Sequence, residues 1–382
     1  MNTRNTRLRR TAIALASSAI AVSLAGCGVV DGIGGSDSKA SPTKGDDIKV
    51  GLLLPEKANT RYEKFDYPII NEQVKKLTNG KGEVIHLNAE QSASKQNAQL
   101  QQLVDDKVDV LLVDAVDSKA IAGGVRKAKA AGIPVIAYDR LAEGPIDAYI
   151  SFDNELVGEV QGKELLKALG TNTATKQIVM MNGAPTDPNA AQFKAGAMSV
   201  LDGKVEIAQK YDTKDWDPAQ AKANMEKAIS AIGLSNVAGV YSANDGLAGG
   251  VIDAMKTMGV NKVPPVTGQD AELDAVQRIL LGEQYMSVYK SYPQEATAAA
   301  EMAVAKVQGR GIEFDALTRD KVDSPTAQKI PAQLVPVVAL TKDNIKETVL
   351  QDNIYSLSEI CKMDLLLDLM GPWSEVRAMA GR

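Results

Sequence analysis

Short apolar segments alternate with amphipathic segments along the chain from Ile48 onward. The apolar segments have the length and composition of β-strands, and they span residues 48–54, 82–87, 108–114, 133–139, 148–152, 177–183, 205–211, 237–243 and 264–270. Between them, segments such as 67–78, 92–106 and 120–131 carry apolar residues at helical spacing. This regular alternation predicts βαβ units with parallel sheets and right-handed crossovers.

The second half of the pattern repeats part of the first. Residues 118–140 and 245–270 both contain Ala-Gly-Gly-Val in a predicted helix, followed by a strand that ends in a polar cluster. The repeat predicts an α/β fold of two Rossmann-like lobes with parallel sheets. Ligands of open α/β sheets bind beyond the carboxyl ends of the strands, so two facing lobes would form a binding cleft there.

The first residues have the features of an export signal. Four arginines precede an apolar run of small residues, 11–26, which is shorter than a membrane-spanning helix needs. The run ends in Leu24-Ala25-Gly26-Cys27, which resembles a bacterial lipobox. We therefore predict a lipoprotein signal peptide at 1–26 and, at 27–47, a lipidated Cys27 and a flexible tether that hold the folded part outside the cytoplasm at the cell membrane. A buried free cysteine in an apolar N-terminal helix is the alternative.

Composition narrows the chemistry further. The 382 residues include one histidine, His86, and two cysteines, too few for a His/Cys metal cluster or a disulfide scaffold. A Ser-His-Asp triad would have to use His86. The formal net charge of −5 becomes more negative when the N-terminal arginines are removed, which argues against nucleic acid as a partner. Neither a P-loop nor a well-placed Rossmann glycine fingerprint occurs, so no cofactor is predicted.

Polar and aromatic residues gather directly after the predicted strands. They lie at Lys290 and in segments 55–62, 138–140, 182–189, 211–216, 242–245 and 268–270. Charged and amide groups offer directed hydrogen bonds in a desolvated cleft, and flat aromatic faces suit the C–H faces of a pyranose. Asp, Asn and Ser also cap helices and fill turns, but capping does not require arginines, a lysine and two aromatic residues. Glu56 is interpreted as a solvated loop charge, and Asp114 as part of a helix cap.

The chain resembles the type I periplasmic sugar-binding proteins of ABC importers, and most closely the D-xylose-binding protein group. The resemblance covers roughly residues 48–361 and is carried by segments 137–162, 181–193, 241–250, 267–273, 286–290 and 341–349. Among these, the YDR…YISFDN and GQDAEL motifs are the most specific. The resemblance implies two stacking residues, Tyr62 and Trp216. It also implies hydrogen bonds to a sugar from Arg61, Asp139, Arg140, Asn189, Asn244, Asp270 and Lys290.

The resemblance also implies how the lobes are joined. Three crossing strands are expected near 152–154, 268–271 and 334–340. They would give a first lobe of 48–152 plus 271–333 and a second lobe of 153–270 plus 334–361. The resemblance ends near residue 361, and we interpret 362–382 as a divergent tail. Closure about such a hinge would trap the sugar and present a surface to the membrane permease.

The sequence thus predicts a non-enzymatic lipoprotein that captures a monosaccharide, D-xylose or a similar aldose, and delivers it to an ABC permease. Its expected partners are the sugar, the permease subunits and, through the lipid, the membrane, and we expect a monomer. Three alternatives stay open. They are a receptor for a sensor partner, an exported glycosidase with Asp139 and Asp270 as paired carboxylates, and a sugar-responsive repressor, which the lipobox disfavours.

Overall fold

The computed structural model describes residues 43–361. The predicted signal peptide, Cys27, nearly all of the tether and the tail 362–382 lie outside the described residues. Within residues 43–361, no helix has both the length and the apolar character needed to cross a membrane.

The first lobe is built on a seven-stranded sheet within the described residues, in the order β10-β11-β5-β4-β3-β1-β2. All neighbouring strands are parallel except β10 and β11, which are antiparallel. The strands are β1 (Lys49–Leu54), β2 (Glu83–Asn88), β3 (Val110–Val113), β4 (Val135–Tyr138), β5 (Ala148–Phe152), β10 (Asp320–Val322) and β11 (Ile330–Val335). The helices are η1 (Tyr62–Asp66, a π-helix), α1 (Tyr67–Leu77), α2 (Ala93–Asp105), α3 (Ala122–Ala130), α9 (Tyr292–Val307) and α10 (Gly311–Leu317).

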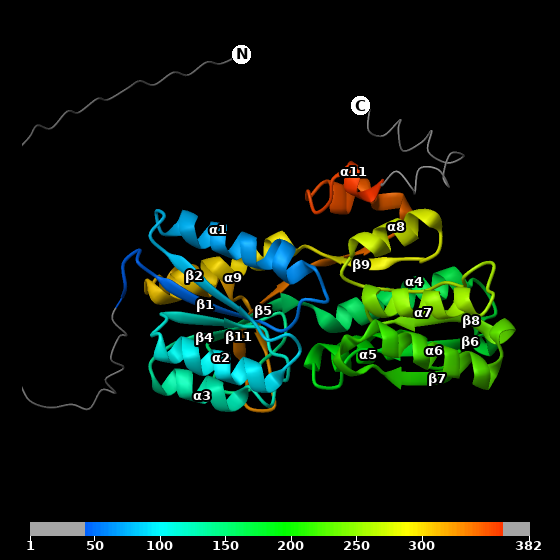
Figure 1. Ribbon diagram of the computed structural model, residues 1–382, viewed down its shortest axis with the longest axis horizontal. Helices are drawn as coiled ribbons and strands as arrows, with labels where there is room; N and C mark the ends of the chain where they lie inside the picture. The colour runs from blue at the N-terminus through cyan, green and yellow to red at the C-terminus, as the bar shows by residue number, and fades with distance from the viewer. Residues whose placement is uncertain (1–42, 362–382) are drawn as a thin grey trace, which may run out of the picture. The chain divides into compact units, whose positions relative to one another are not determined.

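Helices cover both faces of this sheet. In Figure 1, α1 and α9 lie on one face, and α2 and α3 lie on the other. The alternation of side chains along β1 supplies both interfaces: Leu52 and Leu54 belong to the core under α1 and α9, whereas Leu53 belongs to the core under α2 and α3. Burial on both faces explains why the strands are continuous apolar runs in the sequence.

The second lobe has a parallel sheet in the order β7-β6-β8, which isolated bridges and a β9-β12 pair extend. The strands are β6 (Gln177–Asn182), β7 (Glu206–Asp212), β8 (Val237–Ser242), β9 (Ser287–Lys290) and β12 (Val337–Leu340). The longer helices are α4 (Asn154–Leu169), α5 (Pro188–Leu201), α6 (Pro218–Ile232), α7 (Asp245–Thr257) and α8 (Leu273–Leu281). Short helices are η2 (Thr173–Thr175), η3 (Lys214–Trp216), η4 (Leu234–Asn236), η5 (Lys342–Asn344), η6 (Lys346–Leu350) and α11 (Leu357–Ile360). The predicted α/β architecture of two lobes with parallel sheets is confirmed.

The predicted strand at 264–270 does not form as such. This segment makes only two isolated bridges, Val240 to Val266 and Gln269 to Val288. Pro264 and Pro265 have no backbone N–H to give to a ladder, which explains why a regular strand cannot begin there. The segment nevertheless lies at the edge of β8 and delivers Asp270 to the end of the sheet.

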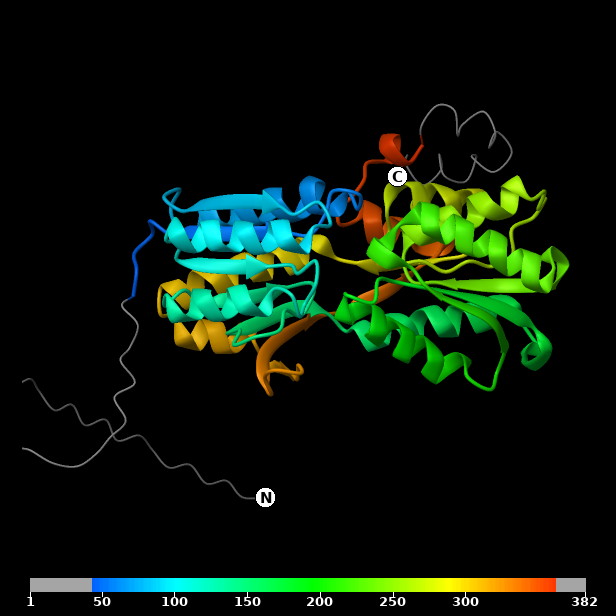
Figure 2. The same cartoon turned by 60° about the horizontal axis from the view of Figure 1, so that its bottom comes forward.

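The chain crosses between the lobes three times, as the green, yellow and orange segments of Figures 1 and 2 show. The first crossing runs from β5 to α4 across 152–154, and the third lies at Pro336 between β11 and β12. The second follows Lys290 and does not fall at 268–271 as predicted. Because β9 pairs with β12, and Met286 and Val288 belong to the core of the second lobe, residues 287–290 lie in that lobe. The predicted assignment of 271–333 to the first lobe is therefore wrong for the residues up to Lys290, which lie in the second lobe.

Candidate ligand-binding site

A polar pocket lies between the carboxyl ends of the strands of the two lobes. Its empty volume is about 330 Å³, part of which is open to solvent. The structure brings all nine predicted site residues into its lining, together with five others. The lining residues are Glu56, Asn59, Arg61, Tyr62, Asp139, Arg140, Asp187, Asn189, Phe193, Trp216, Asn244, Gln269, Asp270 and Lys290.

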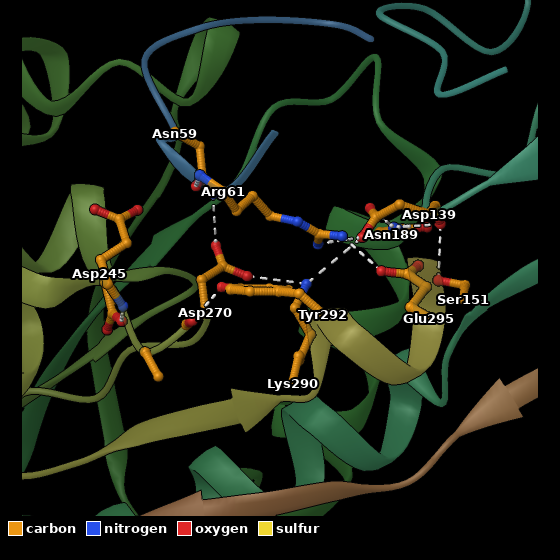
Figure 3. Close-up of polar contacts among 12 residues, drawn as sticks. Asn59, Arg61, Asp139, Ser151, Asn189, Asp245, Asp270, Lys290, Tyr292 and Glu295 are labelled. Atoms are coloured by element: carbon orange, nitrogen blue, oxygen red, sulfur yellow. Dashed lines mark hydrogen bonds and ion pairs between the residues drawn. The ribbon is translucent and has the colours of Figure 1, made fainter. Parts of the chain in front are cut away.

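Arg61 follows β1 and is buried among three carboxylates, two of which, Asp139 and Glu295, are labelled in Figure 3. Its Nε lies 2.9 Å from Oδ2 of Asp66, its Nη1 lies 2.7 Å from Oδ2 of Asp139, and its Nη2 lies 2.5 Å from Oε2 of Glu295. Burial disfavours the charged guanidinium, but Asp66 and Glu295 raise the pKa of Arg61 well above its ordinary value. The guanidinium is therefore a fixed, permanently charged donor.

Lys290, at the end of β9, links two carboxylates of the pocket (Figure 3). Its Nζ lies 2.9 Å from Oδ1 of Asp270 and 3.8 Å from Oδ2 of Asp139. Burial would raise the pKa of Asp139, but the charges of Lys290 and Arg61 outweigh burial and hold it below its ordinary value. Burial likewise opposes the charge of Lys290, whose pKa is raised because of Asp270 and Asp139. Both side chains stay ionised in a site shielded from water.

Asp139 is held by donors from both lobes. The hydroxyls of Tyr149 and Ser151 donate to its carbonyl oxygen at 2.8 and 2.7 Å. From the second lobe, Nδ2 of Asn189 donates to the same carbonyl at 3.0 Å and to Oδ1 of Asp139 at 3.2 Å. Oδ1 of Asn189 is buried and has no hydrogen-bond partner among residues 43–361. An acceptor in that position suits a hydroxyl donor of a ligand.

Arg140 forms a second buried group with three carboxylates. Its Nε lies 3.0 Å from Oδ2 of Asp187 and 3.5 Å from Oδ1 of Asp114, and its Nη2 donates to Oε1 of Glu56 at 3.4 Å. Burial raises the pKa values of Glu56 and Asp187, and Arg140 counteracts this rise in each case.

Three aromatic side chains line the pocket, Tyr62 from the first lobe and Phe193 and Trp216 from the second. Tyr62 is buried, and the guanidinium of Arg61 lies 5.2 Å from its ring centre. Trp216 packs directly on Gly183, where a Cβ atom would come within 2.0 Å of the indole ring. The edge-to-face contact of Trp216 with Phe193 has a centroid distance of 6.3 Å. These contacts pack Tyr62 and Trp216 into the lining of the pocket, where each ring offers a flat apolar surface.

Asn244 shows that capping and lining can coincide. Its Oδ1 accepts the backbone N–H of Leu247 at 2.9 Å, so the residue is the N-cap of α7 and also lines the pocket.

His86 is not among the residues that line the pocket. Its ring stacks on Tyr67 at a centroid distance of 4.4 Å.

The sequence interpretations of Glu56 and Asp114 are wrong. Glu56 is only 5% exposed and pairs with Arg140, so it is not a solvated loop charge. Asp114 is fully buried facing Arg140, whereas the capping oxygen of that loop belongs to Asp117. Asp187, Asn59, Phe193 and Gln269 also line the pocket, although they were not among the nine predicted site residues. All except Phe193 lie in segments 55–62, 182–189 and 268–270, which the sequence pattern already marked as following predicted strands.

The arrangement suits a small neutral molecule with many hydroxyl groups. Charged donors and acceptors are already fixed by their neighbours, so they can meet hydroxyls without large rearrangement. Asp139 and Asp270 both pair with Lys290, an arrangement that holds two carboxylate acceptors in place for ligand hydroxyls.

Comparisons with known proteins agree with this chemistry. Residues 50–311 match the family model for the periplasmic binding protein domain. The chain is 32% identical to the D-xylose-binding periplasmic protein of Escherichia coli (strain K12), over 82% of this chain and 93% of that protein. It is 34% identical to the multiple sugar-binding periplasmic protein SbpA of Azospirillum brasilense, over 80% of this chain and 89% of that protein.

A solved structure of a sugar-binding protein is also similar to this chain. The ABC transporter solute-binding protein of Clostridium phytofermentans with bound β-D-glucose matches with a TM-score of 0.75 and 26% identity, over 82% of this chain and 100% of that one. The resemblance found in the sequence is therefore confirmed. The chain belongs to the periplasmic binding protein family, among the extracytoplasmic sugar-binding proteins of ABC transporters.

Proposed function

We propose that this protein captures a monosaccharide, D-xylose or a similar aldose, in the pocket between its lobes and delivers it to an ABC permease. The observation that carries the proposal is the pocket between the lobes, in which fixed charged groups from both lobes lie beside Tyr62 and Trp216. A pyranose has hydroxyls at its rim and C–H groups on its faces, which match this combination of groups.

The choice of a neutral sugar rests on the charges of the pocket, and the choice of an aldose rests on the relatives. Carboxylates outnumber the three cationic side chains around it, which disfavours sugar acids and sugar phosphates. Several charge-assisted hydrogen bonds and two stacking faces can supply the roughly −8 kcal/mol of a micromolar complex. Among the relatives, one is named for D-xylose and another for multiple sugars, and a related structure holds β-D-glucose.

Calorimetric titration with a panel of pentoses and hexoses tests the proposal. We expect D-xylose or a close aldose to bind, and Asp270→Asn to weaken binding by about 2 kcal/mol or more, because it removes a charged acceptor beside Lys290. Asp253→Asn is the matched control, since that carboxylate pairs with Lys222 on the surface. If no aldose binds, or if both variants bind equally well, the assignment is wrong.

The proposal includes anchoring through a lipid on Cys27, which is supported by the Leu24-Ala25-Gly26-Cys27 motif. Cys27→Ser should move the protein from the membrane fraction to the soluble extracytoplasmic fraction. Retention of this variant in the membrane fraction would count against the anchor.

A further inference from the structure

Asp187 contacts both an arginine of the first lobe and an aromatic ring of the second. Its Oδ2 lies 3.0 Å from Nε of Arg140 and accepts the indole N–H of Trp216 at 3.1 Å. Its Oδ1 accepts the backbone N–H of Asn189 at 2.9 Å, so the same side chain is the N-cap of α5. Asp187 is 4% exposed, and all of these contacts are therefore shielded from water.

The two main partners of Asp187 come from different lobes. Arg140 follows β4 in the first lobe, whereas Trp216 lies in η3 after β7 in the second. The bond between Asp187 and Trp216 joins groups within one lobe and does not depend on the other. The pair between Asp187 and Arg140 needs both lobes to be together, so it belongs to the closed arrangement.

The loop that carries Trp216 needs an external restraint. Asp215 and Trp216 have φ values of 55° and 54°, a left-handed conformation that is unfavourable for residues other than glycine. Gly183 and Phe193 contact the ring through van der Waals surfaces, which resist compression but do not fix its rotation. The hydrogen bond from Nε1 to Asp187 fixes the direction of the indole edge.

We propose that Asp187 is a positioning residue for the sugar site, which orients the Trp216 ring and links that orientation to closure on Arg140. The inference rests on the proposed function, because it names a further residue of the same site. The carboxylate need not touch the sugar to act, since it works through the indole ring and the guanidinium.

The capping role of Asp187 can be separated from its bridging role. Asp187→Ser keeps a good N-cap for α5 but is too short to reach Arg140 and Trp216. Arg140 retains Glu56 and Asp114 in this variant, so its charge is not left alone. Asp187→Asn keeps one acceptor but loses the charge. The matched control is Asp217→Ser, because Asp217 is exposed and caps α6 through the same Asp-Pro arrangement.

Calorimetry with the aldose that binds the wild type should show the affinity of Asp187→Ser lowered about tenfold or more, with Asp187→Asn between it and the wild type. The thermal midpoint and the sugar affinity of the Asp217→Ser control should both stay close to those of the wild type. The Trp216→Phe background keeps a flat ring but lacks the N–H. In this background, Asp187→Ser should lower the sugar affinity by a distinctly smaller factor than it does in the wild type. An equal cost in both backgrounds, or unchanged binding by Asp187→Ser, would overturn the inference.

Tryptophan fluorescence without sugar distinguishes this failure from failure of the proposed function. Asp187→Ser should shift the emission of Trp216, and Trp373, the other tryptophan, is common to both spectra. If the wild type binds no aldose, the proposed function fails, and the positioning role then depends on this spectrum alone. An unchanged spectrum would overturn the inference in that case too.

Discussion

Three residues of the pocket hold a backbone conformation that most side chains avoid. Asp139, Trp216 and Asp270 have φ values of 54°, 54° and 93°. Such conformations cost about 1–3 kcal/mol each and persist where the surroundings hold them. For Asp139 these restraints are the hydroxyls of Tyr149 and Ser151. The strain is therefore placed at residues whose side chains line the pocket, and Figure 3 shows Asp139 and Asp270 directed toward Lys290.

Asp245 provides the corresponding support next to Asp270. Its Oδ1 accepts from Nε2 of Gln284 at 2.7 Å, and its Oδ2 accepts from the hydroxyl of Ser287 at 2.7 Å and from the backbone N–H of Glu272 at 3.0 Å. This carboxylate thereby connects the start of α7 to the turn that follows Asp270. Because it is fully buried, its protonation affects the stability of the fold.

Asp245 should make stability depend on pH. Burial raises its pKa to about 7 from an ordinary value of 3.8, with Arg278 acting against the rise and Asp270 adding to it. Between these values the folded protein keeps a proton that the unfolded chain has released, so the free energy of unfolding falls as pH rises. We expect urea unfolding to show a fall on the order of 3 kcal/mol from this group between about pH 4.5 and about pH 7.5.

The comparison of Asp245→Asn with the wild type isolates this contribution. The amide does not titrate, so the decline with pH should be smaller in the variant, even though the variant loses an acceptor and is less stable throughout. Asp253→Asn, on the surface, should keep the wild-type slope. Equal slopes in Asp245→Asn and the wild type would show that Asp245 does not titrate in this window.

The positions of the site residues could be predicted better than their partners. Arg61, Asp139 and Lys290 follow strands, and strand ends can be recognised from local apolar runs. The burial of Glu56 and Asp114 could not be predicted in this way. Their environment depends on Arg140, which is distant in sequence from Glu56, and a charged residue in a loop is usually solvated.

At the scale of elements, the loop between β6 and α5 packs against the Trp216 ring, which comes from the loop after β7. Gly183 directly follows β6, and the Trp216 ring occupies the space where a side chain would be. The ring can approach the backbone this closely because position 183 has no Cβ atom. The position of the stacking ring is thus set by a glycine on a different loop.

Gly183→Ala should displace this ring. A Cβ atom 2.0 Å from the indole requires movement of the ring or the loop, so we expect a loss of about 1–3 kcal/mol in stability and about tenfold weaker sugar binding. Thermal unfolding and calorimetry measure the two effects. Gly123→Ala is the control, because that glycine lies in α3, where a Cβ atom would meet only the end of the Arg126 side chain at 3.9 Å, and it should gain stability without changing affinity. Unchanged binding by Gly183→Ala would show that the ring does not contact the sugar.

The elements that the sequence predicted correctly are those with strong local patterns. The runs around β1, β3 and β6 are continuous and apolar, and each is a buried strand. The prediction failed at 264–270, where prolines prevent a ladder, and at the second crossing. That crossing depends on β9 pairing with β12, a contact between distant parts of the chain that no local pattern contains.

At the scale of the whole binding unit, direct contacts at the rim join the two lobes. Nε2 of Gln91 donates to the carbonyl oxygen of Asp215 at 3.1 Å, and the backbone N–H of Ser118 donates to the carbonyl of Thr186 at 3.4 Å. These contacts do not involve a ligand, and they require the lobes to be together. They should therefore stabilise the closed form that holds the sugar, and shift the population toward it.

Gln91→Ala should consequently release the sugar faster. The side chain contributes a hydrogen bond worth about 0.5–1.5 kcal/mol to the closed form, so dissociation should accelerate about two- to tenfold while association changes little. Stopped-flow measurement of tryptophan fluorescence gives both rates. Gln101→Ala is the matched control, because within residues 43–361 the Gln101 side chain bonds only to Asp105 and Lys127 of its own lobe. A slower association with unchanged dissociation would mean that Gln91 acts before closure, and that the rim contact does not retain the sugar.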